Sequence, residues 1–352
     1  MFSNDMSRFS ELSVGAATAY AELTEQTRSF ERSNALAGLV GSFHKLLRKG
    51  RAYWYFAYRD LDSKVRMVYV GPDDERVRAL VDRFEGARGT RPLAPQAQAA
   101  LALGCAAATP KHFRIIKRLS EYGFFRAGGI LVGTHAFLAL GNLLGVRWTE
   151  AAATLDADFA HPGKNVSLAL PADLRIDVHG ALESLEMGLL PAVQFGGKAG
   201  SHDRNPKDHE LRIDFVTSAT RRRGPVVMPE LNLALQPLKF MELSLESPLQ
   251  ACVLAQAGAC MINVPTPERY AVHKILIAGE RPIAERTKAK KDLVQAASLA
   301  SYFLEAGDAR VFNGMWRETL RRGPGWRSRL MRGKSALVKL APDVDAEDLW
   351  KA

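Results

Sequence analysis

The chain has 352 residues, enough to bury a full hydrophobic core and to form two or three structural units. Hydrophobic residues make up 47% and charged residues 24% of the sequence, which excludes an intrinsically disordered protein. The formal net charge of +10 favours polyanionic partners such as nucleotides, RNA or DNA, although an ordinary solvated basic surface has the same balance.

The cysteines and the hydropathy pattern bear on where the protein works. Cys105, Cys252 and Cys260 lie in apolar surroundings and lack the spacing of metal ligands. We therefore expect a cytoplasmic protein without a disulfide framework or structural zinc. No run of about 18 apolar residues occurs, and charged residues come early in the N-terminal segment, so we expect neither export nor a membrane contact.

The first third of the chain changes its hydrophobic period. Apolar residues at helical spacing predict mainly helix over residues 6–48. Aromatic and β-branched runs at 51–58 and 65–70 then predict a β-hairpin, followed by a helix with Val77 and Phe84 on its apolar face. The Gly, Arg and Pro content of residues 86–98 predicts a linker.

The hairpin combines aromatic and basic side chains, which suits an acceptor-binding surface. Adjacent aromatic residues alternate between the two faces of a strand, so some of them must belong to a core. The structural and functional interpretations therefore both stay open. The residues concerned are Tyr53, Trp54, Tyr55 and Tyr58, with Lys45, Arg48, Lys49, Arg51 and Arg59 beside them.

The middle of the chain alternates strands and helices, which predicts an α/β fold with a mixed sheet. Further strands are expected at 238–245 and 251–264, and two helices between 267 and 306. We divide the chain into an N-terminal helical region with the β-hairpin (1–110), a catalytic core (111–250) and a mainly helical C-terminal domain (251–352). The alternation consists of a helix at 113–122, a strand after Gly128-Gly129, a helix at 136–144, a strand at 153–160, a helix near 182–188 and a strand at 210–217.

Two carboxylates on one expected strand, in Leu155-Asp156-Ala157-Asp158-Phe159, are the most informative feature. Alternate residues of a strand share a face, so Asp156 and Asp158 can point at one spot. Two carboxylates this close repel each other unless a cation lies between them, and Mg²⁺ prefers oxygen ligands. The pair therefore predicts a site for a divalent metal.

A small-residue turn about twenty positions earlier supplies the complement. Gly133, Thr134 and His135 open an expected helix directly after an apolar strand. Free backbone N–H groups at a helix N-terminus, beside a hydroxyl, bind phosphate. We expect Gly133 and Thr134 to bind the triphosphate, and His135 either to contact phosphate or simply to pack.

A third acid lies on a later segment. Asp214 is at the centre of an expected strand, Glu210-Leu211-Arg212-Ile213-Asp214-Phe215-Val216-Thr217. Asp177, in the similar segment Leu174-Arg175-Ile176-Asp177-Val178-His179, competes with it for the same role. We prefer Asp214 because its flanking residues are more typical of a strand, which gives a metal site of Asp156, Asp158 and Asp214.

This arrangement resembles the nucleotidyltransferase superfamily, whose pattern is a Gly-Ser turn, an Asp-x-Asp strand and a later strand with a third Asp. Thr134 replaces the usual Ser and keeps the hydroxyl. The resemblance implies a minimal nucleotidyltransferase core and transfer of a nucleoside monophosphate from an NTP to a hydroxyl, with two Mg²⁺ ions and release of pyrophosphate. It implies that Asp156 and Asp158 hold both ions and that Asp214 holds the one near the attacking hydroxyl.

A finer resemblance covers roughly residues 40 to 305 and points to a bacterial group of nucleotidyltransferases. More distantly, Lys274 and the pair Lys291-Asp292 resemble the C-terminal pattern of abortive-infection-type nucleotidyltransferase toxins. This implies that Lys274 and Asp292 reach back to the nucleotide, and it implies a toxin or phage-defence role with an antitoxin-like partner. The segments that carry the finer resemblance are Gly41-Ser42-Phe43-His44, Tyr53-Trp54-Tyr55, Tyr69-Val70-Gly71-Pro72, Gly133-Thr134-His135-Ala136-Phe137 and Pro267-Glu268-Arg269-Tyr270-Ala271-Val272-His273-Lys274.

The acceptor is not determined by these residues. The basic charge and the aromatic hairpin favour a nucleic acid such as tRNA, ahead of a protein hydroxyl and a small-molecule hydroxyl. A different class also stays open, namely an RNA-binding module whose nucleotidyltransferase core is inactive.

Overall fold

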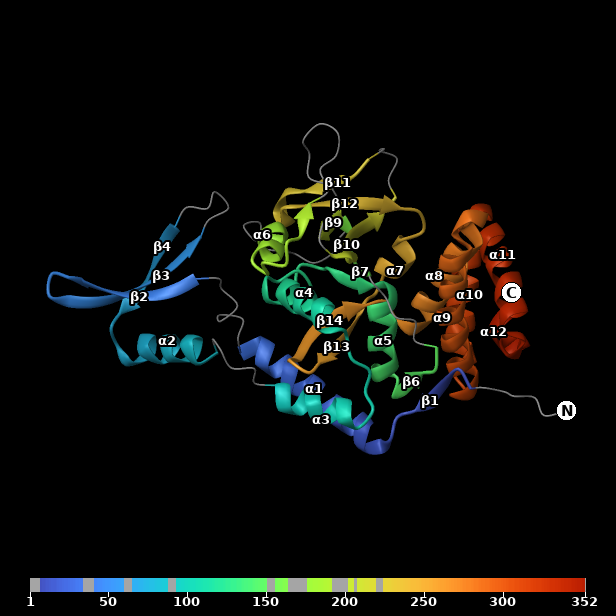
Figure 1. Cartoon of the computed structure of the whole chain (residues 1–352), viewed down its shortest axis with the longest axis horizontal. Helices are drawn as coiled ribbons and strands as arrows, with labels where there is room; N and C mark the ends of the chain where they lie inside the picture. The colour runs from blue at the N-terminus through green and yellow to red at the C-terminus, as the bar shows by residue number, and fades with distance from the viewer. Residues whose placement is uncertain are drawn as a thin grey trace.

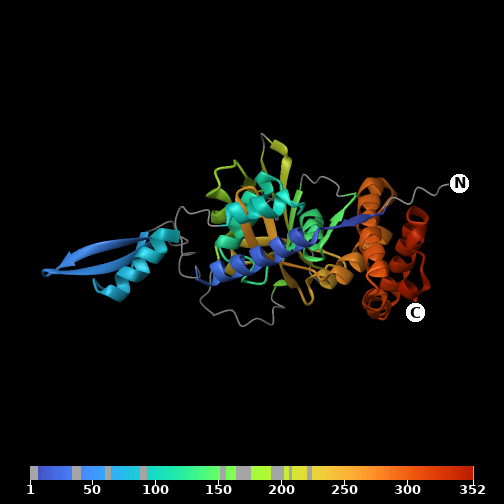
Figure 2. The ribbon, with the colours of Figure 1, turned by 90° about the horizontal axis from the view of Figure 1, so that it is seen from below.

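The computed structural model extends along one axis as three parts (Figures 1 and 2). A small sheet with one helix projects from one end, a mixed sheet with helices lies in the centre, and a group of helices forms the other end. The structure describes residues 7–33, 41–59, 65–87, 93–150, 156–163, 176–191, 202–205, 208–219 and 224–351.

The central sheet has the strand order β11-β12-β10-β7-β5, and β8 and β9 pair alongside β10. β10 is parallel to both β7 and β12, whereas β5, β9 and β11 pair antiparallel with their neighbours. This confirms the expected α/β fold with a mixed sheet. The strands are β5 (Ile130–Val132), β7 (Asp156–Ala160), β8 (Leu190–Pro191), β9 (His202–Asn205), β10 (Asp208–Ser218), β11 (Val226–Met228) and β12 (Leu233–Leu238).

Helices α4 (Pro110–Glu121), α5 (Gly133–Leu143) and α6 (Val178–Glu183) pack around this sheet. The core between them is aromatic: the Phe124 ring lies 5.9 Å from both Phe159 and Phe215, between ring centroids. All three side chains are fully buried. Because residues of β7 and β10 alternate, burying Phe159 and Phe215 turns the aspartates of both strands to the opposite face.

The N-terminal helix belongs to the central part. Helices α1 (Val14–Ser33) and α3 (Ala94–Ala102) pack on the hairpin of β13 (Leu249–Ala255) and β14 (Gly258–Val264). The buried Tyr20 hydroxyl accepts a hydrogen bond from the Cys252 N–H at 3.0 Å. The segment before α1 also pairs with the central part, because β1 (Phe9–Glu11) forms a short antiparallel strand pair with β6 (Val146–Trp148). All three cysteines are buried and unpaired, which confirms that they form no disulfide.

The projecting part is a three-stranded antiparallel sheet with a helix on one face (Figure 1). Phe43 and Phe56 of the sheet contact Phe84 of the helix at 5.0 and 5.6 Å between ring centroids. The elements are β2 (Gly41–Arg48), β3 (Arg51–Arg59), β4 (Val65–Pro72) and α2 (Glu75–Ala87).

The C-terminal end is helical, as expected. Helices α8 and α11 pack closely: a Cβ added at Gly279 of α8 would overlap the Arg329 carbonyl of α11, so glycine permits this crossing. In the ranges that the structure describes, no helix is both long and apolar enough to span a membrane. The helices are α7 (Glu242–Leu245), α8 (Pro267–Glu280), α9 (Arg286–Glu305), α10 (Ala309–Leu320), α11 (Pro324–Leu340) and α12 (Glu347–Trp350).

Several predicted elements are wrong. Residues 41–48 form strand β2 and not helix, because pairing with the aromatic strand β3 outweighs the helical spacing of their apolar residues. The expected linker at 86–98 overlaps α3, which begins at Ala94 and ends at Ala102. No strand covers residues 238–245 as expected: β12 ends at Leu238, Phe240 takes a φ of +66°, and α7 begins at Glu242. The expected boundaries near residues 110 and 250 stay a prediction.

Candidate active site

The aspartates of β7 and β10 lie on neighbouring strands in direct register. Asp158 lies opposite Asp214, and Asp156 lies opposite Arg212. Neighbouring strands are about 4.8 Å apart, and register partners point to the same face of a sheet. Asp214 is therefore adjacent to Asp156 and Asp158 on one face, although it is more than 50 residues away in the sequence.

The turn after β5 closes this site from the side. β5 pairs with β7 so that Val132 lies opposite Asp158, and α5 begins at the next residue, Gly133. Gly133 has a φ of +67°, a conformation that other residues rarely adopt. A Cβ at this position would overlap Oδ2 of Asp158, so the carboxylate lies directly against the Gly133 backbone.

The site has an excess of negative charge at its centre. Burial, together with the negative charges of Asp214 and Asp156, raises the pKa of Asp158 to about 6, and Lys274 and Lys291 oppose this effect only in part. At neutral pH the Asp158 carboxylate is therefore ionised at a free-energy cost that a bound cation would remove. The donor set, three carboxylates, fits a hard divalent ion such as Mg²⁺.

Arg212 forms an ion pair with Asp214, the third aspartate. Its Nε lies 2.8 Å from Oδ2 and 2.9 Å from Oδ1 of Asp214. In this arrangement, the described ranges contain no group of three His, Cys, Asp or Glu side chains that could hold a metal ion. Asp214 therefore has a cationic partner on its own strand, and a bound metal ion would compete with Arg212 for this carboxylate.

A buried ion cluster on the C-terminal helices borders the same site. Lys274 Nζ lies 2.7 Å from Asp292 Oδ1, and Arg281 Nε lies 2.7 Å from Asp292 Oδ2. Burial alone would lower the pKa of Lys274, but Asp292 outweighs this and raises it, so Lys274 is charged. Asp292 thus orients Lys274, whose charge acts on Asp158.

Two further side chains connect these helices to the turn. The Tyr270 hydroxyl of α8 lies 2.9 Å from the Gly133 carbonyl oxygen and 2.8 Å from Gln295 Oε1 of α9, and it can donate its single proton to either oxygen. Gln295 Nε2 donates to Thr134 Oγ1 at 3.3 Å. The C-terminal helices therefore fix both residues of the turn.

A comparison with known protein families covers the region that contains this site. The model of a family described as nucleotidyltransferase matches residues 111–321, more than half of the chain. The chain belongs to this nucleotidyltransferase family. The matched region contains the three aspartates, the Gly133-Thr134 turn and the Lys274–Asp292 pair. No curated protein and no solved structure gives a significant match.

The nucleotidyltransferase is an enzyme whose family uses a nucleoside triphosphate as substrate. A hollow of about 360 Å³ lies between the segment after β6 and the N-terminal half of α9. It adjoins the turn through Gln295, and Lys291 in its lining acts on Asp158 and Asp156. The residues that line this hollow are Thr149, Glu150, Thr287, Lys290, Lys291, Val294 and Gln295.

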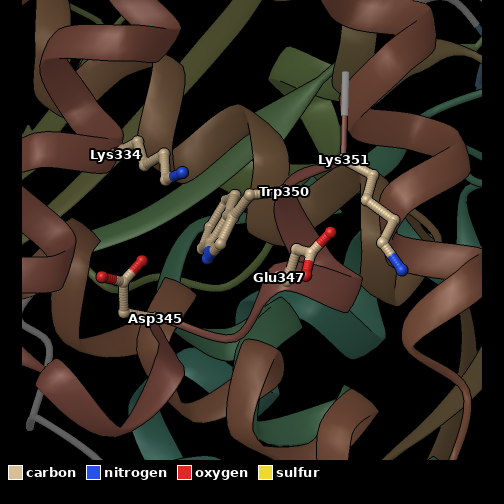
Figure 3. Close-up of a pocket in the computed structure, with 5 residues that line it drawn as sticks. All are labelled: Lys334, Asp345, Glu347, Trp350 and Lys351. Carbon is tan, nitrogen blue, oxygen red and sulfur yellow. The ribbon is translucent and has the colours of Figure 1, made fainter.

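A second hollow lies at the C-terminal end of the nucleotidyltransferase (Figure 3). Lys334 Nζ lies 5.0 Å from the ring centroid of Trp350, and Lys351 Nζ lies 2.9 Å from Asp348. It is remote from β7 and β10 in both views of the ribbon. We assign it no part in nucleotide transfer.

The structure bears on two alternatives that the sequence left open, at Asp177 and at His135. Asp177 lies on no strand: it caps α6, where its side chain accepts hydrogen bonds from the Gly180 N–H and from Asn232, both at 2.8 Å. This leaves Asp214 as the acid opposite Asp158. The His135 side chain is buried with its ring 4.6 Å from that of His112, and burial lowers its pKa to about 3. A phosphate contact by the His135 ring is therefore not supported.

Some residues of the site were not predicted from the sequence. Arg212 lies two positions before Asp214 on the same face of one strand, which is a usable signal. Tyr270 precedes Lys274 by one helical turn, and Gln295 is a polar residue within the apolar stripe of α9. A buried polar residue in such a stripe indicates a specific partner.

Burial of Asp158 predicts how the stability of the metal-free enzyme depends on pH. Its pKa rises from 3.8 to about 6 on folding, so the folded state binds the proton more tightly. The resulting stabilisation is present below pH 3.8 and is lost as pH rises through 6, by about 3 kcal/mol at most. Urea unfolding in EDTA between pH 4 and 7 measures this, with Asp158→Asn as the control that lacks this loss. An identical pH dependence in both proteins would contradict it.

Removing the shared carboxylate of the ion cluster is expected to destabilise the fold at neutral pH. Asp292→Asn leaves the partly buried cations Lys274 and Arg281 without their shared carboxylate, and we expect a loss of about 3–5 kcal/mol in the free energy of unfolding. Asp348→Asn, which breaks the exposed pair with Lys351, serves as control and should have a much smaller effect, because solvent screens this pair. Equal losses for the two variants in urea unfolding would show that the cluster has no special role.

Proposed function

We propose that this enzyme transfers a nucleoside monophosphate from a magnesium-bound NTP to a hydroxyl of a nucleic acid, with tRNA as the favoured acceptor. The observation that supports it best is the register of Asp158 with Asp214 beside the Gly133 turn. The acceptor oxygen bonds to the α-phosphorus as the bond to the pyrophosphate oxygen breaks, and pyrophosphate leaves with the β- and γ-phosphates.

Each part of the site has a role in this reaction. Asp156, Asp158 and Asp214 would hold the metal, and two bound Mg²⁺ ions supply stabilisation of the attacking and leaving oxygens. The backbone N–H groups at the start of α5, at Gly133 and Thr134, bind the triphosphate. Lys291 adds positive charge in the adjoining hollow, and Asp214 helps to accept the proton of the attacking hydroxyl.

The direct test is incubation with each NTP, labelled at the α-phosphate, with Mg²⁺ and bulk cellular RNA or protein. We expect label in the RNA fraction with the parent chain and none with Asp158→Ala. Label in the protein fraction alone would replace the proposed acceptor. RNA binding without transfer of label in any fraction would contradict the proposed reaction.

We further propose that the transfer is toxic to the cell that makes the enzyme, as in toxin or phage-defence systems. The support is the position of Lys274 and Asp292, which lie paired beside the carboxylate site as the resemblance to such toxins requires. Induced expression of the parent chain should arrest bacterial growth, whereas Asp158→Ala should not. Equal growth of the two cultures would contradict this role.

A further inference from the structure

The projecting sheet has two unlike faces. Phe43 and Phe56 point toward α2, where both contact Phe84. Tyr53, Tyr55 and Tyr69 are on the opposite face, since they alternate with the α2-facing residues and contact one another. Among the elements that the structure describes, only α2 lies on this sheet (Figures 1 and 2). We call the face with the three tyrosines the open face.

The open face presents a cluster of aromatic rings to solvent. Tyr69 is 54% exposed, and its ring centroid lies 6.0 Å from that of Tyr53 and 5.6 Å from that of Tyr55. The Arg48 guanidinium lies 5.5 Å from the Tyr55 ring centroid. Adjacent exposed rings of this kind stack on nucleic acid bases, and a guanidinium beside them contacts phosphate.

The charge of the sheet is complementary to a phosphate backbone. Residues 41–59 and 65–72 contain six Lys or Arg residues and no Asp or Glu. Asp60 and Asp62 stand between the two ranges in the sequence, and Asp73 follows them, with Lys45 Nζ 2.5 Å and Arg78 Nε 2.9 Å from its carboxylate. The strands themselves are therefore basic, and the acids lie between β3 and β4 in the sequence and before α2. The six residues are Lys45, Arg48, Lys49, Arg51, Arg59 and Arg66.

We propose that the open face binds unpaired nucleotides of an RNA strand, with the three tyrosines stacking on bases and Arg48 contacting phosphate. Bases in a duplex have their faces covered by their neighbours, so a stacking surface selects single-stranded segments. The choice of RNA rests on the proposed function, whose acceptor is RNA. The proposed reaction does not by itself require a single-stranded acceptor. This surface adds the expectation that a single-stranded segment of the RNA binds to the sheet.

The test is binding of a short, unstructured, fluorescent RNA to the full chain, measured by anisotropy in EDTA without NTP. We expect Tyr55→Leu and Tyr69→Leu each to weaken binding by about fivefold or more, and Tyr69→Phe to bind as the parent does. Tyr58→Leu is the matched control, because Tyr58 is on the same strand but on the face toward α2. Arg48→Gln should lower the slope of log affinity against log salt by about 0.7.

Several outcomes would overturn the proposal. These are no binding of RNA by the parent, equal binding of single-stranded and duplex RNA, tighter binding of single-stranded DNA, or equal effects of Tyr58→Leu and Tyr69→Leu. Circular dichroism and thermal melting establish that each variant is folded. Binding is measured without catalysis, so the two proposals can fail separately. Tyrosine-dependent binding without transfer of label would support the RNA-binding surface and contradict the proposed reaction. Transfer of label to RNA without any effect of the tyrosines on binding would do the reverse.

Discussion

Replacing Asp158 by asparagine is expected to lower the rate of nucleotide transfer by at least about 100-fold, the usual effect of removing one charge-stabilising group from an active site. Asp158 lies between Asp156 and Asp214 and against the Gly133 backbone, so it has the central position of the three. Steady-state transfer of labelled NMP measures the effect.

Asp177→Asn is the matched control for this variant. Asp177 caps α6 through hydrogen bonds from the Gly180 N–H and Asn232, and it does not lie on the face of the three aspartates. We expect the Asp177 variant to keep the parent rate, apart from a loss of stability. If Asp158→Asn kept more than half of the parent activity, Asp158 would not be a catalytic residue.

Gly133→Ala is expected to reduce transfer by a similar factor and to destabilise the fold. The added Cβ would overlap the Asp158 carboxylate, and alanine at a φ of +67° is strained. Displacing Asp158 disrupts the carboxylate site and the start of α5 together. Transfer assays and urea unfolding measure the two effects.

Gly145→Ala separates backbone strain from the steric clash. Gly145 has a φ of +71°, close to that of Gly133, and a Cβ there would meet no atom within 4 Å. We expect it to lose stability but to retain transfer activity. Equal activities of the two alanine variants would show that contact between Gly133 and Asp158 is unimportant.

The sequence predicted the elements with strong local patterns. Asp156 and Asp158 alternate with buried Ala157 and Phe159, so the strand and its polar face follow from the period of two. Asp214 alternates with Ile213 and Phe215 in the same way. The pairing of β7 with β10 is a long-range property, however, and it came from the resemblance to the family and not from the period.

The failures have a common physical cause, which is that distant residues decided the local structure. Residues 41–48 have apolar spacing that suits a helix, but strand β3 supplies the hydrogen bonds that make them a strand. Asp177 resembled Asp214 in its flanking residues, and only the neighbouring Asn232 and the start of α6 identify it as a cap.

The central claim is that Asp156, Asp158 and Asp214 together hold a divalent cation beside the Gly133 turn. Titration with Mn²⁺ in the presence of a non-hydrolysable NTP analogue, followed by electron paramagnetic resonance, measures this binding without catalysis. We predict that the parent chain and Asp177→Asn bind Mn²⁺ with the same affinity, and that Asp158→Asn and Asp214→Asn each bind it at least about tenfold more weakly. Parent-like binding of Mn²⁺ by Asp214→Asn would contradict the claim.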